Sequence, residues 1–192
     1  MHVFGMDVGF AKTGLTVFDV HSYGDVLIAA HVLRSECEPM PHQASEDVAR
    51  CQNLVDQLDN LFNRYKPAAI FAEIPGSSAQ SARAGRCMAL ATGWIASYVA
   101  VRRIPHDFMI PSVVEKLVGI KLDPNDAKGM KANERQKWKK ERSKNVVVAA
   151  FPDFAGWPPQ VTLAEDAYDS AAAFMAGRIK NQLYKQILKV GE

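Results

Sequence analysis

The N-terminal segment "VFGMDVGFAKTGLTVFDV", residues 3–20, places one acidic side chain inside a run of strand-forming residues. The Val, Phe and Thr content predicts strands over residues 2–8 and 13–20, and Asp7 falls within the first of them. Moving an ionised carboxylate out of water costs free energy unless it is paired or binds a cation. Asp7 therefore predicts either a turn or sheet-edge position, which the flanking glycines would favour, or a positively charged partner.

The remaining pattern predicts an α/β fold. Residues 25–33 are a third predicted strand, and because the connections are short, we expect an antiparallel meander. We expect further strands over 68–74 and 105–110, helices over 44–65, 79–101, 133–150 and 163–188, a short helix from Pro111, and loops over 121–132 and 152–160. This order is typical of a five-stranded mixed sheet flanked by helices, in one domain over residues 1–192.

Composition bounds the class of protein. With 48% hydrophobic and 23% charged residues, the 192-residue chain resembles a globular domain rather than a disordered one. No apolar run reaches the roughly 18 residues that a membrane helix needs, and the start "MHVFGMDVG" lacks a signal-peptide pattern. We therefore expect a cytoplasmic protein. Three cysteines without Cys-x-x-Cys spacing predict neither a disulfide framework nor a zinc ribbon.

The charge of the chain is unevenly distributed. The net charge is only +2, yet residues 128–144, "KGMKANERQKWKKERSK", contain eight Lys or Arg and two Glu. The rest of the chain contains 15 basic and 19 acidic residues. A basic segment on an acidic body predicts either a polyanionic partner such as nucleic acid or a solvated helix face.

Three further acids fall where the predicted elements can bring them to Asp7. Glu73 lies at the end of the predicted strand 68–74, and ligand sites in open α/β sheets gather at such strand ends. Asp166 and Asp169 stand three residues apart in the last predicted helix, so they share one face of it. Converging carboxylates repel one another unless cations neutralise them, and oxygen ligands without His or Cys favour Mg²⁺ or Mn²⁺. The pattern predicts a two-ion hydrolytic site, although each acid alone also fits an ion pair, a turn or a helix terminus.

The segments around these acids, "GMDVGFAKTG", "IFAEIPGSSAQSARAG" and "EDAYDSAAAFMAG", resemble the three acidic motifs of the RuvC-type Holliday junction resolvases. The motifs keep the family's order and span almost the whole chain. The resemblance implies a ribonuclease H-like fold, a homodimer, and divalent-metal-dependent nicking of branched DNA by paired cuts at four-way junctions. It implies that Asp7, Glu73, Asp166 and Asp169 are the catalytic metal ligands. A bacterial cell or a phage-infected host would fit such a protein.

Basic residues are expected to contact the DNA phosphates. The segments "IPSVVEKLVGI" and "SKNVVVAAF" resemble the family's DNA-contacting region, which implies that Lys116 and Lys144 lie near the scissile phosphates. Trp138, inside the basic stretch, is expected either to stack on an unpaired base or to pack against a neighbouring element. The basic stretch and the start of helix 79–101 supply the other candidates, which are Arg83, Arg86, Lys137, Lys139 and Lys140.

Other features qualify the resemblance. Bacterial members of the family commonly carry an aromatic residue three positions after the second-motif acid, and here that position is Gly76. The loop and basic helix over 121–144 are also longer than in those members. Helix 79–101 is rich in Ala and Gly, which predicts close approach of another backbone, either that of a dimer partner or that of the sheet.

Two alternative functions stay open. "DVGFAKTG" also resembles the phosphate loop of the sugar kinase and actin-like ATPase superfamily, in which Asp7 would bind the metal of a nucleotide. The chain is short for that two-lobed architecture, which also gives the acids of the last helix no role. A DNA-binding module without catalysis is the third hypothesis, although it leaves the acidic set unexplained.

Overall fold

The computed structural model of the protein describes residues 1–76, 81–123, 125, 127–180 and 182–190. Parts of three predicted elements lie outside the described residues: 79 and 80 of the second helix, 124 and 126 of the loop before the basic helix, and 181 of the last helix.

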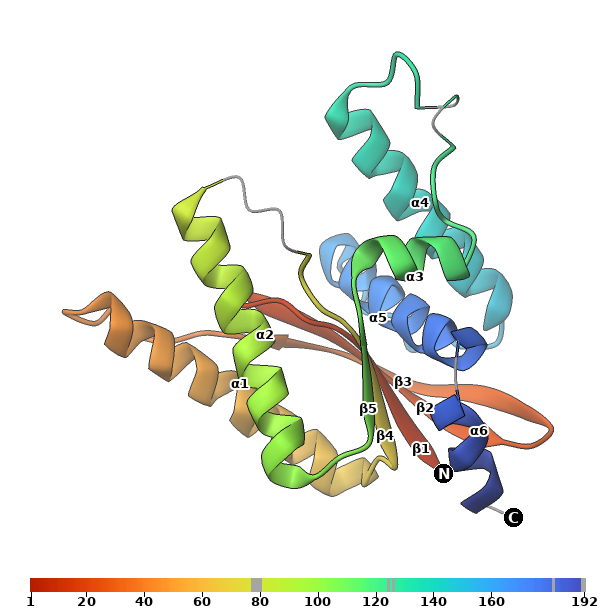
Figure 1. Cartoon of the computed structure of the whole chain (residues 1–192), viewed down its shortest axis with the longest axis horizontal. Coiled ribbons are helices and arrows are strands. Elements are labelled where there is room, and N and C mark those ends of the chain that lie inside the picture. The colour runs from red at the N-terminus through yellow and green to blue at the C-terminus, as the bar shows by residue number, and fades with distance from the viewer. Residues whose placement is uncertain (77–80, 124, 126, 181, 191–192) are drawn as a thin grey trace.

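Five strands form one sheet with helices on both of its faces (Figure 1). The strands are β1 (His2–Asp7), β2 (Lys12–His21), β3 (Gly24–Arg34), β4 (Ala69–Glu73) and β5 (His106–Met109). The helices are α1 (Gln43–Tyr65), α2 (Ala82–Arg102), α3 (Pro111–Leu117), α4 (Ala132–Ala150), α5 (Val161–Lys180) and α6 (Gln182–Val190). The expected class, an α/β fold around a mixed sheet, is confirmed.

The sheet has the strand order β3-β2-β1-β4-β5. Strand β2 pairs antiparallel with both β1 and β3, as the short connections predicted, whereas β4 pairs in parallel with both β1 and β5. Strand β1 is central, and its residues Val3, Phe4 and Met6 are fully buried because helices cover both faces of the sheet.

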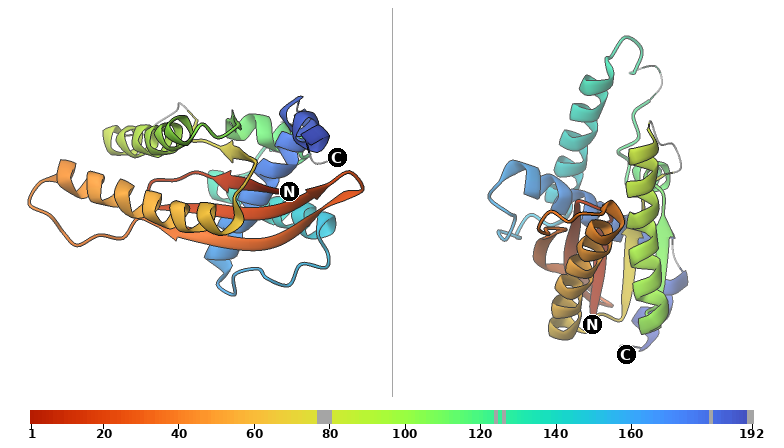
Figure 2. Two further views of the ribbon diagram at one scale, coloured as in Figure 1. Left: turned by 90° about the horizontal axis from the view of Figure 1, so that it is seen from below. Right: turned by 90° about the vertical axis from the view of Figure 1, so that its left-hand side faces the viewer.

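The sheet separates two hydrophobic cores. One core lies under α3, α4, α5 and α6 and contains Phe18 and Phe174, whose rings stack at 3.7 Å between centroids. The other lies under α1 and α2 and contains Phe4, Leu54 and Trp94. Figure 1 shows these two sets of helices on opposite sides of the strands, and Figure 2 shows the same layers from two further directions.

Helix α5 lies directly on the sheet because glycines leave no side chain between them. A Cβ atom at Gly14 of β2 would lie 2.0 Å from the carbonyl oxygen of Asp166. A Cβ atom at Gly5 of β1 would lie 2.4 Å from the carbonyl oxygen of Ser170. On the helix itself, a Cβ atom at Gly177 would lie 2.4 Å from a phenyl ring of β4. These glycines therefore determine how closely α5 crosses β1, β2 and β4.

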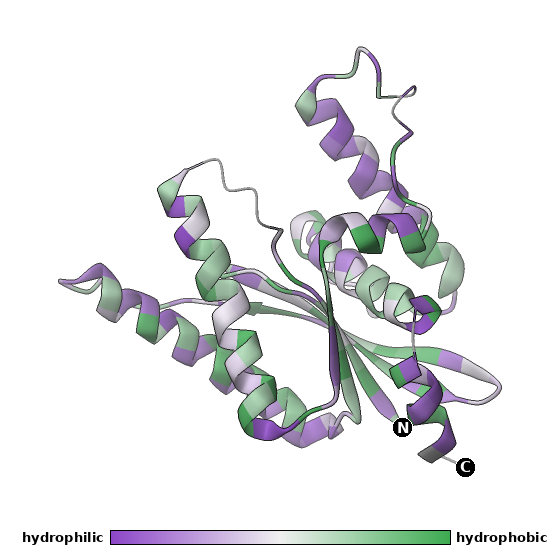
Figure 3. Cartoon of the chain, viewed as in Figure 1, coloured by the Kyte–Doolittle hydropathy of each residue, from purple (hydrophilic) through white to green (hydrophobic). Residues whose placement is uncertain are grey.

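Helix α4 projects beyond the rest of the molecule (Figures 1 and 2). Its first half is mostly hydrophilic (Figure 3), and residues 132–137 are exposed. Its second half packs on α5 through Ser143 and Val147, which are buried. Among the described residues, no helix combines the length and the apolar character required to cross a membrane.

The prediction of a single last helix over 163–188 is wrong. Helix α5 ends at Lys180, and α6 runs in a different direction from Gln182 (Figure 1). The Tyr184 hydroxyl donates a hydrogen bond to Asp25 Oδ1 at 2.6 Å, at the start of β3, and the Tyr184 ring meets Phe174 edge-on. These contacts hold α6 against the β2–β3 hairpin and the core.

Candidate active site

The four predicted acids gather at one end of the sheet. Asp7 is the last residue of β1 rather than a mid-strand residue, and the parallel register pairs it directly with Glu73, the last residue of β4. Asp166 and Asp169 lie on α5. The backbone of Asp166 contacts Gly14, which stands opposite Asp7 on β2. Two strand ends and one helix therefore bring the four acids to the same edge.

Burial, together with the charges of neighbouring acids, raises the pKa values of Asp7, Glu73 and Asp169. The pKa of Asp7 is raised to about 7, first by burial and then by the charges of Asp169 and Asp166. The pKa of Glu73 is raised to about 9, first by burial and then by the charges of Asp7 and Asp169. Burial also raises the pKa of Asp169, against the hydrogen bond that it accepts from Ser143. Such clusters of perturbed carboxyl groups are typical of functional sites.

Two neighbours from other elements contact the acids of α5. Lys12 Nζ, at the start of β2, lies 2.6 Å from Asp166 Oδ2. The Ser143 hydroxyl of α4 donates a hydrogen bond to Asp169 Oδ1 at 2.8 Å. These contacts compensate part of the negative charge and hold both carboxylates in their present orientation.

A cavity of about 170 Å³ opens beside Glu73, between α3, α4 and α5. Its two lysines come from α4, and each contacts an acid from another helix. Lys139 Nζ lies 2.6 Å from Glu115 Oε1 of α3, and Lys140 forms an ion pair with Glu165 of α5. The cavity thus joins the acidic cluster to cationic groups that can bind the oxygens of a phosphate.

The four acids have the donor chemistry of a site for a hard divalent cation, since Mg²⁺ and Mn²⁺ prefer carboxylate oxygens. Among the residues that the structure describes, however, no three His, Cys, Asp or Glu side chains converge closely enough to hold a metal ion. Asp166 is engaged by Lys12 and Asp169 by Ser143. A cation bound by all four acids would have to displace these contacts of Asp166 and Asp169.

The raised pKa values predict that cation binding releases protons, because a protonated carboxyl group is a poor ligand. At pH 7, Asp7 is about half protonated and Glu73 is mostly protonated. We expect Mg²⁺ to release about 1.5 protons at this pH and to bind more tightly as the pH rises from about 6 to 9. Calorimetric titration in two buffers of different ionisation enthalpy measures this release, and a binding heat independent of the buffer would contradict it.

The predicted DNA-contacting lysines fall into two groups. Lys139 and Lys140 line the cavity beside the acids. Lys137 and Lys144 on α4 and Lys116 on α3 are exposed to solvent and lie outside that lining. The placement of Lys116 and Lys144 near a scissile phosphate therefore stays a prediction.

The predicted arginines lie at the start of α2, away from that cavity. Arg83 is exposed in the first turn. Arg86 Nε donates a hydrogen bond at 2.7 Å to Asp47 Oδ2 of α1, a side chain that is only 8% exposed. Arg86 thus neutralises a buried acid and joins two helices, and a contact with DNA stays a prediction for both arginines.

Two other positions singled out from the sequence lie on other segments. Trp138 is half-buried on α4. A Cβ atom at Gly76 would meet Pro111 at 4.0 Å.

Several side chains that contact the acids or line the cavity were not predicted from the sequence. Lys12 belongs to the same motif as Asp7, and a cation so near an unpaired acid was a signal that could have identified it. Ser143 stands three residues after Lys140, on the same face of the helix. Knowing which face of α4 packs on α5 would therefore have identified Ser143 as well. The complete set of missed residues is Lys12, Glu115, Ser143 and Glu165.

Comparisons with known proteins bear on the fold. No protein-family model and no curated protein matches the sequence. The structure is nevertheless similar to RuvC of Thermus thermophilus in complex with a Holliday junction substrate, at 15% sequence identity and a TM-score of 0.62, covering 97% of this chain and 96% of that chain. It is also similar to the Fowlpox virus resolvase in complex with Holliday junction DNA, at 12% identity and a TM-score of 0.52, covering 91% and 97%. The yeast mitochondrial Holliday junction resolvase matches at 14% identity and a TM-score of 0.50, covering 98% and 83%.

These similarities define the fold class as that of the ribonuclease H-like resolvases. The likeness extends over almost the whole chain, so the fold that the three acidic motifs predicted, that of the RuvC-type resolvases, is confirmed.

Proposed function

We propose that the protein is a divalent-metal-dependent endonuclease, a single domain over residues 1–192, that nicks branched DNA and resolves four-way junctions by paired symmetric cuts. The observation that carries this proposal is that the four acids lie at one edge of a resolvase-like sheet, beside a cavity lined by lysines. The phosphotransferase alternative gives Asp166 and Asp169 no role, and a non-catalytic module gives the whole set none.

The acids and the lysines of the site have different proposed roles in phosphodiester hydrolysis. Two Mg²⁺ or Mn²⁺ ions, held by the four acids, would supply Lewis-acid stabilisation of the phosphate and an activated water. Asp7 and Glu73 form the rigid side of the site because they end two adjacent strands. Lys139 and Lys140 are placed to bind the non-bridging oxygens of the scissile phosphate after they leave their glutamate partners.

A cleavage assay tests this function directly. Labelled four-way junction, flap and linear duplex are incubated with Mg²⁺, with Mn²⁺ and with a chelator, and the nicks are mapped. We expect symmetric paired nicks in the junction, only when a divalent cation is present. Nicking that survives the chelator, or equal cleavage of the linear duplex, would contradict the proposal.

Helix α4 is proposed to supply phosphate contacts that make DNA binding salt-dependent. The double variant Lys137→Ala/Lys144→Ala should reduce the slope of log K against log salt concentration by roughly 2, since each lost contact removes about 0.9. The matched control Lys185→Ala/Lys189→Ala removes the same charge from exposed positions of α6, at the other end of the molecule (Figure 1). Equal slopes for the α4 variant and the wild type, measured by fluorescence anisotropy, would refute this assignment.

A nuclease that makes two symmetric cuts is expected to act as a two-fold dimer, and we propose that α2 forms its interface. The small residues of α2 lie on two faces. Ala91 is buried against the sheet, whereas Gly85, Ala89, Gly93 and Ala96 line an open groove on the outer face. Another helix can approach this outer row closely, because none of the described residues that pack on α2 would lie within 4 Å of a Cβ atom at Gly93.

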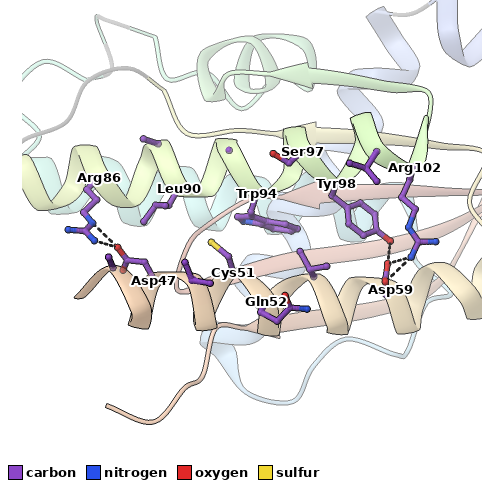
Figure 4. Close-up of a pocket in the computed structure, with 16 residues that line it drawn as sticks. Asp47, Cys51, Gln52, Asp59, Arg86, Leu90, Trp94, Ser97, Tyr98 and Arg102 are labelled. Carbon is purple, nitrogen blue, oxygen red and sulfur yellow. Dashed lines mark hydrogen bonds and ion pairs between the residues drawn. The ribbon is translucent and has the colours of Figure 1, made fainter. Parts of the chain in front are cut away.

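A second groove, of about 810 Å³, runs beside this row between α1 and α2 (Figure 4). Its wall includes Val48 and Val101, whose exposed fractions of 69% and 82% are high for apolar side chains. Trp94 forms part of its floor, and ion pairs between the two helices lie at both ends (Figure 4). This groove and the small-residue row together form one exposed apolar surface, which a second copy of α2 could cover.

Gly93→Arg is expected to convert the dimer to a monomer. The open space around Gly93 accommodates the new side chain within one subunit, but the arginine blocks close approach of a second helix. Light scattering at micromolar concentration measures the mass, and Val26→Arg, an exposed position on β3, is the control that should stay dimeric. A Gly93→Arg protein that stays dimeric would contradict the proposed interface.

A further inference from the structure

Lys12 places a positive charge beside two of the four acids, Asp166 and Asp7. Its Nζ atom is 2.6 Å from Asp166 Oδ2 and 3.5 Å from the carbonyl oxygen of Thr162, in the first turn of α5. Its charge also acts on Asp7, whose pKa it lowers against the effects of burial and of the neighbouring acids. Lys12 therefore compensates negative charge on two of the proposed metal ligands from one position.

The contact between Lys12 and Asp166 is an ion pair without hydrogen-bond geometry. Asp166 Oδ2 is buried and accepts no hydrogen bond from the residues that the structure describes, although the ammonium is near. The side chain of Lys12 is 44% exposed, whereas that of Asp166 is 15% exposed. The lysine can consequently move into solvent while the acid stays at the site.

We propose that Lys12 is the resident counter-ion of the acidic cluster: its ammonium occupies a cation position beside Asp166 in the metal-free protein and leaves it when a divalent cation binds. This inference rests on the proposed metal-dependent function and adds a regulatory element to it. By competing for Asp166, Lys12 sets the cation concentration at which the site is filled, and it keeps the acids compatible with folding before any metal is present.

The direction of the change in metal affinity distinguishes a lysine that competes with the metal from one that orients Asp166 for it. A lysine that oriented Asp166 for the metal would support binding, and its loss would weaken metal affinity by about 10- to 100-fold. A competing lysine has the opposite effect, because its loss removes both the competitor and a repulsive charge. A lysine that has withdrawn about 6 Å into solvent, where the dielectric constant is about 80, still repels a divalent ion enough to change its affinity by roughly tenfold.

The test uses the full-length protein without DNA. Calorimetry at pH 8 measures Mg²⁺ and Mn²⁺ affinity for the wild type and for two neutral variants, Lys12→Gln and Lys12→Met. We expect both neutral variants to bind about tenfold more tightly than the wild type. The control Lys12→Arg keeps the charge, and Lys185→Gln removes a charge from exposed α6, so both should stay within about twofold of the wild type.

Thermal unfolding supplies a readout that does not depend on activity. Without metal, the neutral variants should unfold at a lower temperature than the wild type, because Asp166 and Asp7 lose their counter-ion. On adding Mg²⁺ they should gain more stability than the wild type, because a tighter ligand stabilises the folded state more. Weaker or unchanged metal binding in both neutral variants, with a wild type that binds, overturns the role of Lys12 and leaves the proposed function standing. A wild type that binds neither Mg²⁺ nor Mn²⁺ overturns the proposed function and this inference together.

Discussion

Replacement of Asp7 by Asn is expected to lower the rate of junction cleavage by about 10³-fold at saturating Mg²⁺. Asp7 lies between the other three acids. It pairs in register with Glu73 of β4, and the charges of Asp166 and Asp169 of α5 act on it. Loss of a central ligand removes several kcal/mol of charge stabilisation in the transition state. DNA affinity should be retained or increased, because one negative charge fewer faces the phosphates.

The same substitution should stabilise the metal-free protein at pH 8. The folded-state pKa of Asp7 is about 7 against an ordinary 3.8, so the folded state holds the proton more tightly than the unfolded state does. Stability is therefore lost as the pH rises from about 4 through 7, and a neutral Asn avoids a loss of about 4 kcal/mol. Below pH 4 the two proteins should unfold at similar temperatures.

Single-turnover cleavage and thermal unfolding across pH together measure this variant. Asp56→Asn, at an exposed position of α1 on the opposite face of the sheet, is the matched control and should leave both properties unchanged. Cleavage by Asp7→Asn at the wild-type rate would refute the assignment of the active site.

Gly14→Ala is expected to destabilise the protein by about 3 kcal/mol and to abolish metal binding. The new Cβ atom would lie 2.0 Å from the carbonyl oxygen and 2.6 Å from the carbonyl carbon of Asp166, so the backbone of α5 must shift. The shift moves the very residues that supply two of the four acids. For a chain of this size the melting temperature should fall by roughly 10 °C.

The control for this variant is Gly76→Ala, because a Cβ atom there meets its nearest neighbour at an ordinary 4.0 Å. Its stability should stay within about 0.5 kcal/mol of the wild type. If Gly14→Ala melted at the wild-type temperature and bound Mg²⁺ normally, the close crossing of α5 over β2 would not be what positions Asp166.

Local sequence was sufficient to predict the frame of the site. Strand propensity and short connections placed the first three strands, and the apolar run before Glu73 identified β4 as a buried parallel strand. The pairing of Asp7 with Glu73 was not predicted, because it depends on β4 lying beside β1, and local sequence does not determine the strand order. The offset of three residues between Asp166 and Asp169 placed both on one face of α5.

Local sequence could not predict which side chains of a helix face the site, because that depends on how the helix is rotated about its axis. Helix α4 has few apolar positions, so its sequence does not show that Ser143 is buried or that Lys139 and Lys140 face the cavity while Lys137 does not. Likewise, nothing local reveals that Arg86 serves a buried acid on α1. These pairings join residues far apart in the chain and exist only after the layers have packed.

The most direct test of the central claim, that the four acids form one cation site, is a crystal structure of the protein grown with Mn²⁺ and measured at an anomalous wavelength. We expect an anomalous peak bound by Asp7 together with at least two of Glu73, Asp166 and Asp169, with Lys12 withdrawn from Asp166. Mn²⁺ bound elsewhere in the molecule, with these four carboxylates still apart, would contradict the claim.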